Sequence, residues 1–278
     1  MIMKQRIFNS RFKRIFWLIV WVLILIVYLF PFAWMVMTGF RNPVDTYSWP
    51  PKFIFTPTLQ GFHYLFEVRN FQSYLSNSLI VSLLSTFFLI LLATPAAYAS
   101  AHLNPREKGF LLSLLVGRMI PPIALVVPVY LLASRWHLLD TYQVLIAINV
   151  AFNLPFAIWL TRSFFREIPR ELREAAIIDG CSEMNVFRKI VLPLAVRGVA
   201  AAAVFTFIAA WNEFLFAVAL TTKRAATAPV AALGFRTQFG VQWAALGAAS
   251  IMISALVIVF ALAMQKYLLR GMTMGALR

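Results

Sequence analysis

Six apolar runs, each long enough to cross a lipid bilayer as a helix, constrain this chain more than any other feature. An α-helix of about 20 residues spans the hydrocarbon core of a membrane, which is roughly 30 Å thick. With 62% hydrophobic and 13% charged residues, the 278-residue chain has more apolar surface than a water-soluble domain can cover. We therefore predict an all-α integral membrane protein with six transmembrane helices, at about residues 15–38, 78–99, 109–133, 142–165, 196–220 and 243–267.

Two of these runs have alternatives to a single straight membrane helix: a cleaved signal peptide for the first, and a broken helix for the third. Residues 15–38 are too long for the core of a signal peptide, and no A-x-A cleavage site follows, so the run is predicted to be retained. Residues 109–133 contain Pro121, Pro122 and Pro128, and each proline removes a helix hydrogen bond. The third helix is therefore predicted to be kinked or broken near its middle. In the proline-rich external loop, a short interfacial helix is predicted at residues 59–66.

The basic residues set the predicted orientation. The formal net charge is +15, which alone is compatible with nucleic-acid binding, but Lys and Arg lie in the short stretches between the apolar runs. Of the 25, 17 lie on the side of the chain ends and 7 on the other side, with Arg118 inside a run. The positive-inside rule then predicts cytosolic N- and C-termini and no nucleic-acid partner. The predicted organisation is a cytosolic arm at 1–14, one membrane domain at 15–278, and a cytosolic loop at 166–195.

The loop contains the one compact polar stretch, EAAIIDGCSEMNVFRKIVLP at residues 174–193. Pro169 can open a short helix, and Gly180 can close it in the left-handed conformation. Ser182 can then cap a second short helix. We interpret the stretch as two small helices joined by a sharp turn, with Phe187 as an apolar protrusion suited to a groove on another protein.

The spacing of this stretch, EAA, three residues, G, nine residues and then I-x-L-P, resembles the cytoplasmic loop of bacterial binding-protein-dependent ABC importer permeases, especially the maltose-type carbohydrate-uptake branch. The resemblance implies a type I ABC importer permease fold. It also implies that the loop is a coupling helix that sits in a cleft of a separate ATPase subunit. The loop residues that this assigns to the ATPase interface are Glu174, Ala175, Ala176, Asp179, Gly180, Cys181 and Phe187.

The resemblance further implies the function and the partners. The chain would form half of the pathway of an ATP-driven importer, for a sugar or sugar-like solute, in the bacterial inner membrane. Its partners would be a second homologous permease, two ATPase subunits and an extracytoplasmic substrate-binding protein. The external loop 221–242 would reach toward the binding protein. The tail 270–278 resembles the end of carbohydrate permeases that inserts between the ATPase subunits.

Polar side chains inside the apolar runs are candidates for a pathway or gating role, because a buried intramembrane charge is costly. They are Arg118, Asn153, Asn212 and Glu213. The alternative for Glu213 is that it snorkels to the external interface or pairs with a partner helix. Arg118 is interpreted as a helix-packing or gating charge and not as a sugar ligand. Asn153, beside Pro155, can present polar groups to a cavity or hydrogen-bond across helices.

Motifs for chemistry within the chain do not appear in the sequence. There is no G-x-x-x-x-G-K-[ST] phosphate loop, so ATP and Mg²⁺ are expected on the partner ATPase and no enzymatic activity is expected here. His63, His102 and His137 lack Cys or carboxylate neighbours at metal-ligand spacing, and neither a cofactor nor a metal is expected. The alternative function is an ion-coupled secondary transporter, for which only Arg118 and Glu213 offer intramembrane charges.

Overall fold

The structure is a computed structural model that describes residues 2–102, 107–238 and 240–273. The last residues of the predicted tail, 274–278, lie outside the described residues. The chain forms two compact units. Unit 1 contains Met1–Asn70 and Phe235–Met252, and unit 2 contains Phe71–Gly234 and Ile253–Arg278.

Unit 1 is built on the long helix α1 (Ile2–Gly39) and the first part of α12 (Trp243–Thr273). They approach closely where two glycines meet, since a Cβ on Gly247 would lie 2.6 Å from the backbone nitrogen of Gly39. The connecting elements are a 3₁₀ turn (η1, Val44–Tyr47), α2 (Gln60–His63), a π turn (η2, Tyr64–Val68) and the antiparallel strands β1 (Arg236–Thr237) and β2 (Gly240–Val241). The short helix predicted at 59–66 is confirmed by α2 and η2.

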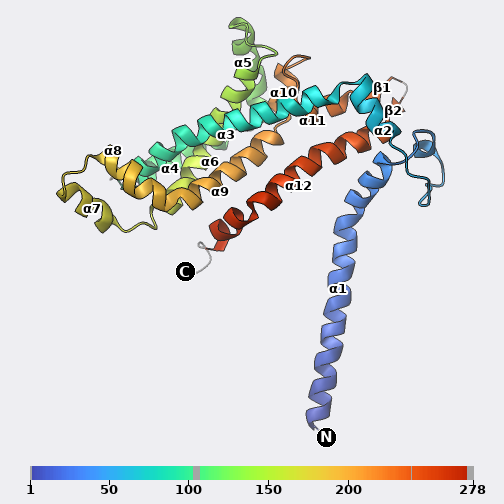
Figure 1. Ribbon diagram of the computed structural model, residues 1–278, viewed down its shortest axis with the longest axis horizontal. Coiled ribbons are helices and arrows are strands. Elements are labelled where there is room, and N and C mark those ends of the chain that lie inside the picture. The colour runs from blue at the N-terminus through green and yellow to red at the C-terminus, as the bar shows by residue number, and fades with distance from the viewer. Residues whose placement is uncertain (1, 103–106, 239, 274–278) are drawn as a thin grey trace. The chain divides into compact units, whose positions relative to one another are not determined.

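Unit 2 is a helical bundle around α3 (Phe71–His102), α6 (Tyr142–Phe165) and α9 (Leu192–Trp211), which lie side by side (Figure 1). Small residues such as Ala93, Ala97, Ala157 and Ala195 are buried between them and allow the helices to pack closely. The shorter elements are α4 (Glu107–Arg118), α5 (Pro122–Arg135), α7 (Arg170–Ile178), α8 (Glu183–Val186), the π turn η3 (Phe187–Val191), α10 (Leu215–Leu220) and α11 (Ala228–Leu233).

The all-α prediction is confirmed, since the described elements are helices apart from two strands of two residues each. Five described helical segments are long and apolar enough to cross a membrane: Lys13–Gly39, Phe71–His102, Tyr142–Phe165, Glu183–Trp211 and Trp243–Gln265. The predicted run 142–165 coincides with α6. The run 196–220 is not one helix, because α9 ends at Trp211 and α10 begins only at Leu215.

The third predicted helix is broken, as the prolines indicated. α4 ends at Arg118 and α5 begins at Pro122, the second residue of the Pro121–Pro122 pair. Neither helix spans a bilayer alone, at 12 and 14 residues. In the sequence they lie between α3, which ends at His102, and α6, which begins at Tyr142 at the opposite end of unit 2.

The two ends of unit 2 are held by different contacts. At one end, the Asn77 side chain donates hydrogen bonds to the carbonyls of Arg224 and Ala226, and Asp140 accepts bonds from the loop after α10. At the other end, the loop containing α7 and α8 packs against the last turns of α3 and α6. The loop that carries the EAA sequence is therefore placed at the opposite end from residues 221–228.

Candidate functional site

The predicted pair of short helices is confirmed at residues 170–191. α7 ends in a Schellman motif, in which Cys181 N–H donates to Ala176 O at 2.9 Å and Gly180 N–H donates to Ile177 O at 3.0 Å. Gly180 has a φ of +84°, the left-handed conformation that a glycine adopts without strain. The Ser182 hydroxyl accepts a bond from Asn185 N–H at 3.4 Å and so caps α8. These local signals fix a sharp turn between α7 and α8.

The prediction that Phe187 protrudes is wrong. Its half-buried ring lies 5.1 Å from the Tyr98 ring and 6.4 Å from the Phe165 ring and packs against the core at this end of unit 2. Ala176, also predicted for docking, is buried at 7% exposure. Contact between aromatic rings stabilises by about 1 kcal/mol, and the rings of Tyr98 and Phe165 offer Phe187 such a contact.

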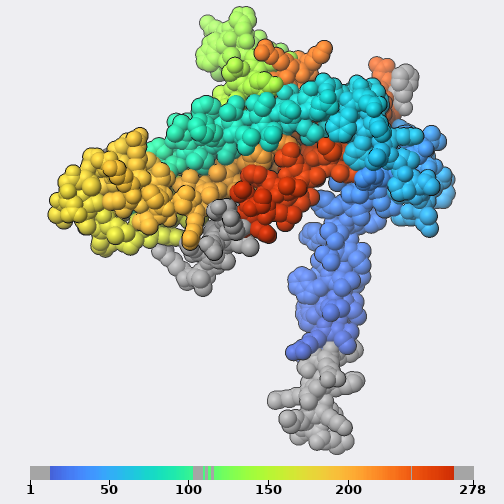
Figure 2. All heavy atoms as spheres, viewed as in Figure 1, coloured from blue at the N-terminus to red at the C-terminus, as the bar shows by residue number. Residues whose placement is uncertain are grey.

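The apolar protrusion of the loop is Ile178, whose residue is 85% exposed. It stands at the end of α7, and Ile177, Leu172 and Met184 are exposed as well. The other predicted loop residues with exposed surface are Glu174, Ala175, Asp179, Gly180 and Cys181. In Figure 2 the yellow atoms of this loop form the outer tip of their end of unit 2.

Sequence reasoning missed these isoleucines, although a signal was present. Consecutive residues on a helix point about 100° apart, so a pair such as Ile177–Ile178 before a helix-ending glycine cannot be buried together on a narrow face. An exposed apolar group on a polar loop is the expected feature of a surface that another protein covers.

A charged cluster that the sequence did not reveal holds the loop together. Arg173 of α7 forms an ion pair with Glu183 of α8, and the Tyr98 hydroxyl of α3 donates to Glu183 Oε2 at 2.9 Å. The Glu183 carboxylate thus binds two side chains, one 10 positions and one 85 positions before it in the sequence.

Within the described ranges, no hydrogen bond or ion pair joins the four intramembrane candidates to one another. Asn153 Nδ2 donates to Asn149 O at 2.9 Å, and Asn212 Nδ2 donates to Ile208 O at 2.8 Å, so both amides bond to their own helices. The Glu213 carboxylate accepts bonds from Phe216 N–H at 2.7 Å and Ala217 N–H at 3.0 Å, which makes it the cap of α10. The interpretations that the sequence left open for Glu213 did not include this role.

Arg118 is the candidate that keeps an exposed charge. It ends α4 beside the proline break, and its guanidinium carbon lies 5.0 Å from the centre of the Phe156 ring. No ion pair to an acidic side chain is found for it among the residues that the structure describes.

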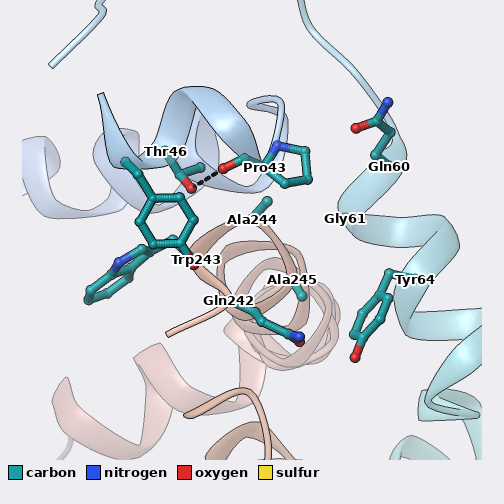
Figure 3. Close-up of a pocket in the computed structure, with 10 residues that line it drawn as sticks. Pro43, Thr46, Gln60, Gly61, Tyr64, Gln242, Trp243, Ala244 and Ala245 are labelled. Atoms are coloured by element: carbon teal, nitrogen blue, oxygen red, sulfur yellow. Dashed lines mark hydrogen bonds between the residues drawn. The ribbon is translucent and has the colours of Figure 1, made fainter. Parts of the chain in front are cut away.

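A cavity of about 250 Å³ lies in unit 1, between the turn after α1, α2 and the start of α12 (Figure 3). Two of its polar side chains are engaged, since Thr46 donates to Pro43 O at 2.6 Å and Tyr47 donates to Val241 O at 2.6 Å. Gln242 Oε1 is buried and has no hydrogen-bond partner within the described ranges. The residues that line the cavity are Pro43, Thr46, Tyr47, Gln60, Gly61, Tyr64, Gln242, Trp243, Ala244 and Ala245.

The described residues contain no cluster of His, Cys, Asp and Glu able to hold a metal ion.

The chain is similar over nearly its whole length to two ABC transporter permease proteins. It is 58% identical over 266 residues to a probable ABC transporter permease protein, y4oR, of Sinorhizobium fredii, with 96% of each chain covered. It is 34% identical to the trehalose/maltose transport system permease protein MalG of Thermococcus litoralis, covering 96% of this chain and 97% of that protein.

Among solved structures, it resembles a chain of a bacterial ABC transporter involved in the import of the acidic polysaccharide alginate, with a TM-score of 0.74, 19% identity, and 93% and 97% of the two chains covered. This likeness supports the type I ABC importer permease fold. Residues 93–274 match the family model described as "Binding-protein-dependent transport system inner membrane component". The chain therefore belongs to this family, as a multi-pass inner-membrane permease of the ABC transporter class.

Proposed function

We propose that this chain forms half of the translocation pathway of an ATP-driven importer and is coupled to a separate ATPase through the loop at residues 166–195. The observation that carries the proposal is the exposed apolar tip of that loop, with Ile178 at 85% exposure beside the exposed Glu174. A compact helix pair with an apolar tip and a polar rim has the surface expected of a protein–protein contact.

The proposed solute is a sugar or a sugar-like molecule. The relative named for trehalose/maltose transport aligns over nearly the whole chain, which supports this class. Specificity would rest largely on an extracytoplasmic binding protein that delivers the solute.

The proposed mechanism is alternating access with a second homologous permease. Two ATPase subunits, which hold ATP and Mg²⁺, close on the loop helices, and their movement opens the membrane helices toward the docked binding protein. Arg118 is the residue we place nearest to the pathway, because an exposed charge within the membrane needs water, solute or a partner group beside it. The termini and the loop are cytosolic in this arrangement, in agreement with the distribution of Lys and Arg.

An ion-coupled secondary transporter is less well supported. Such a carrier needs a titratable group free to bind its coupling ion. Glu213, the acidic candidate, is occupied as the cap of α10.

The test is to replace Ile178 by Asp and to purify the permease pair with its ATPase subunits. A charge at an apolar contact loses the burial of the isoleucine and adds desolvation, so we expect at least about tenfold weaker retention of the ATPase, which is about 1.4 kcal/mol or more. The matched control is Ile54→Asp, which changes an isoleucine that is 95% exposed in the predicted external loop. Full retention and full uptake by Ile178→Asp would overturn the proposed docking surface.

A further inference from the structure

Glu183 joins three elements of unit 2 through its carboxylate. The Tyr98 hydroxyl of α3 donates to Oε2 at 2.9 Å, and Arg173 Nε of α7 donates to the same oxygen at 3.3 Å. The other carboxylate oxygen accepts from Arg173 Nη2. Glu183 itself begins α8, so one side chain ties α3, α7 and α8 together.

The surroundings make this junction more than a surface ion pair. Tyr98 is buried at 4% exposure, and its ring lies 5.1 Å from the Phe187 ring and 6.1 Å from the Phe165 ring. The hydroxyl group is therefore presented to Glu183 from a ring that is fixed by packing. An isolated exposed ion pair contributes little to the free energy of folding. A pair that shares a hydrogen bond with a packed side chain is held in one geometry.

The Tyr98–Glu183–Arg173 junction lies between α7, which carries the proposed docking surface, and α3 of the bundle. Arg173 precedes Glu174 in α7, whose exposed side we assign to the ATPase. The covalent chain leads from this loop into α6 on one side and α9 on the other, and α3 is not adjacent in the sequence. A movement of α7 therefore reaches α3 through side-chain contacts. Besides the apolar packing of Ala176, the polar contact between the two elements is Tyr98–Glu183–Arg173, which passes through Glu183 of α8.

We propose that Tyr98, Arg173 and Glu183 are positioning residues that transmit displacement of α7 to α3. This inference rests on the proposed function, because it takes the ATPase as the source of the displacement. The three side chains act within this chain and are not the groups that hold the ATPase. Their loss is expected to separate ATP hydrolysis from transport.

The first test is Tyr98→Phe, which keeps the packed ring and removes the hydroxyl group. In a complex reconstituted with binding protein, we expect ATPase retention and ATP hydrolysis to stay at the wild-type level. The solute imported per ATP should fall about fivefold to tenfold, the size of a typical coupling between distant sites. The matched control is Tyr142→Phe, which removes a hydroxyl bonded to Asn77 Oδ1 at 2.7 Å at the other end of unit 2. It should leave the import per ATP unchanged.

The second test reverses the ion pair. Arg173→Glu and Glu183→Arg should each lower the import per ATP, and the double variant should recover most of it because the pair is restored in the opposite sense. A merely structural role predicts that the loss and the recovery follow the melting temperature, whereas the proposed role predicts them in the import per ATP of complexes that remain folded. Melting temperatures of the purified variants report on folding.

Two results would overturn the inference. One is an unchanged import per ATP in both Tyr98→Phe and Glu183→Gln, and the other is loss of the ATPase subunits from these variants, which would make the residues docking groups. Failure of the wild-type permease to bind any ATPase would instead refute the proposed function, and the inference with it. The wild-type arm therefore distinguishes the two failures.

Discussion

At the scale of single residues, Asp140 shows how one carboxylate can order a loop. It lies in the left-handed region, at φ 56°, between α5 and α6. Its oxygens accept from the backbone N–H groups of four consecutive residues in the loop after α10, at 2.9–3.3 Å: Thr222, Lys223, Arg224 and Ala225. Burial alone would raise the pKa of Asp140, but these four bonds stabilise the charged form and lower its pKa to about 2.

Asp140→Asn should destabilise unit 2 by about 1 kcal/mol at neutral pH, because an amide oxygen is a weaker acceptor than a carboxylate. Asn tolerates the left-handed conformation, so the backbone should persist. Since the pKa of Asp140 in the folded state is below its ordinary value of 3.8, the carboxylate stabilises fully above about pH 4 and loses its effect as the pH falls toward 2.

Melting temperatures of the two proteins, measured in detergent from pH 7 to pH 2.5, should therefore differ by a constant amount down to about pH 4 and then converge. The control is Asp179→Asn, which changes an exposed carboxylate and should not show this convergence. A difference that stays constant to pH 2.5 would contradict the role of the Asp140 charge.

The roles of such residues could not be predicted from the sequence for two reasons. Some have hydrogen-bond partners that are remote in the sequence, and others lie where a different role is the more obvious one. Asp140 bonds to residues 82–85 positions later, and Tyr98 to one 85 positions later. Glu213 was predicted as a pathway candidate because it lies in an apolar run, yet it caps a helix that begins two residues later. A run of hydrophobic residues does not reveal where a helix stops inside the membrane.

At the scale of elements, the features with local causes were predictable. The proline pair breaks the third helix, and Gly180 with Ser182 sets the turn between α7 and α8. The inward direction of Phe187 was not predictable, because it depends on Tyr98 and Phe165 from two other helices. The exposed apolar group of the loop is Ile178 and not Phe187.

The packing of α9 against α6 gives a prediction at this scale. Gly198 is buried in α9, and a Cβ added there would lie 2.1 Å from Cγ and 2.5 Å from Cβ of Phe164 in α6. The clash is with the atoms of Phe164 nearest its backbone, so a rotation of the ring alone cannot relieve it. Gly198→Ala should therefore destabilise the protein by about 1–3 kcal/mol and lower its melting temperature by several degrees.

The control for this variant is Gly117→Ala in α4, where no described atom lies within 4 Å of the added Cβ. Because alanine favours the helix, this substitution should leave the melting temperature unchanged or slightly raised. Equal melting temperatures for Gly198→Ala and wild type would show that the helices can separate without cost.

At the scale of the whole molecule, the orientation in the membrane is predicted from the distribution of charge along the entire chain. The bundle places the loop at 166–195 and the loop at 221–228 at opposite ends of unit 2, but contacts alone do not say which end faces the cytosol. The excess of Lys and Arg on the side of the EAA loop predicts that this end is cytosolic. Only this orientation gives Ile178 and Glu174 access to ATP-driven partners.

The single cysteine, Cys181, provides the measurement because it is exposed on the loop beside Gly180. A membrane-impermeant maleimide should label it in inside-out vesicles and not in right-side-out vesicles. Addition of the ATPase subunits should slow labelling, since in the proposed docking they cover the neighbouring Ile178. The control is Val44→Cys in a Cys181→Ser background, which places the thiol at a position that is 79% exposed in the predicted external loop and should be labelled from the opposite side. Labelling of Cys181 from outside would put the loop beyond the reach of cytosolic ATPases and would refute both the orientation and the coupling proposed for it.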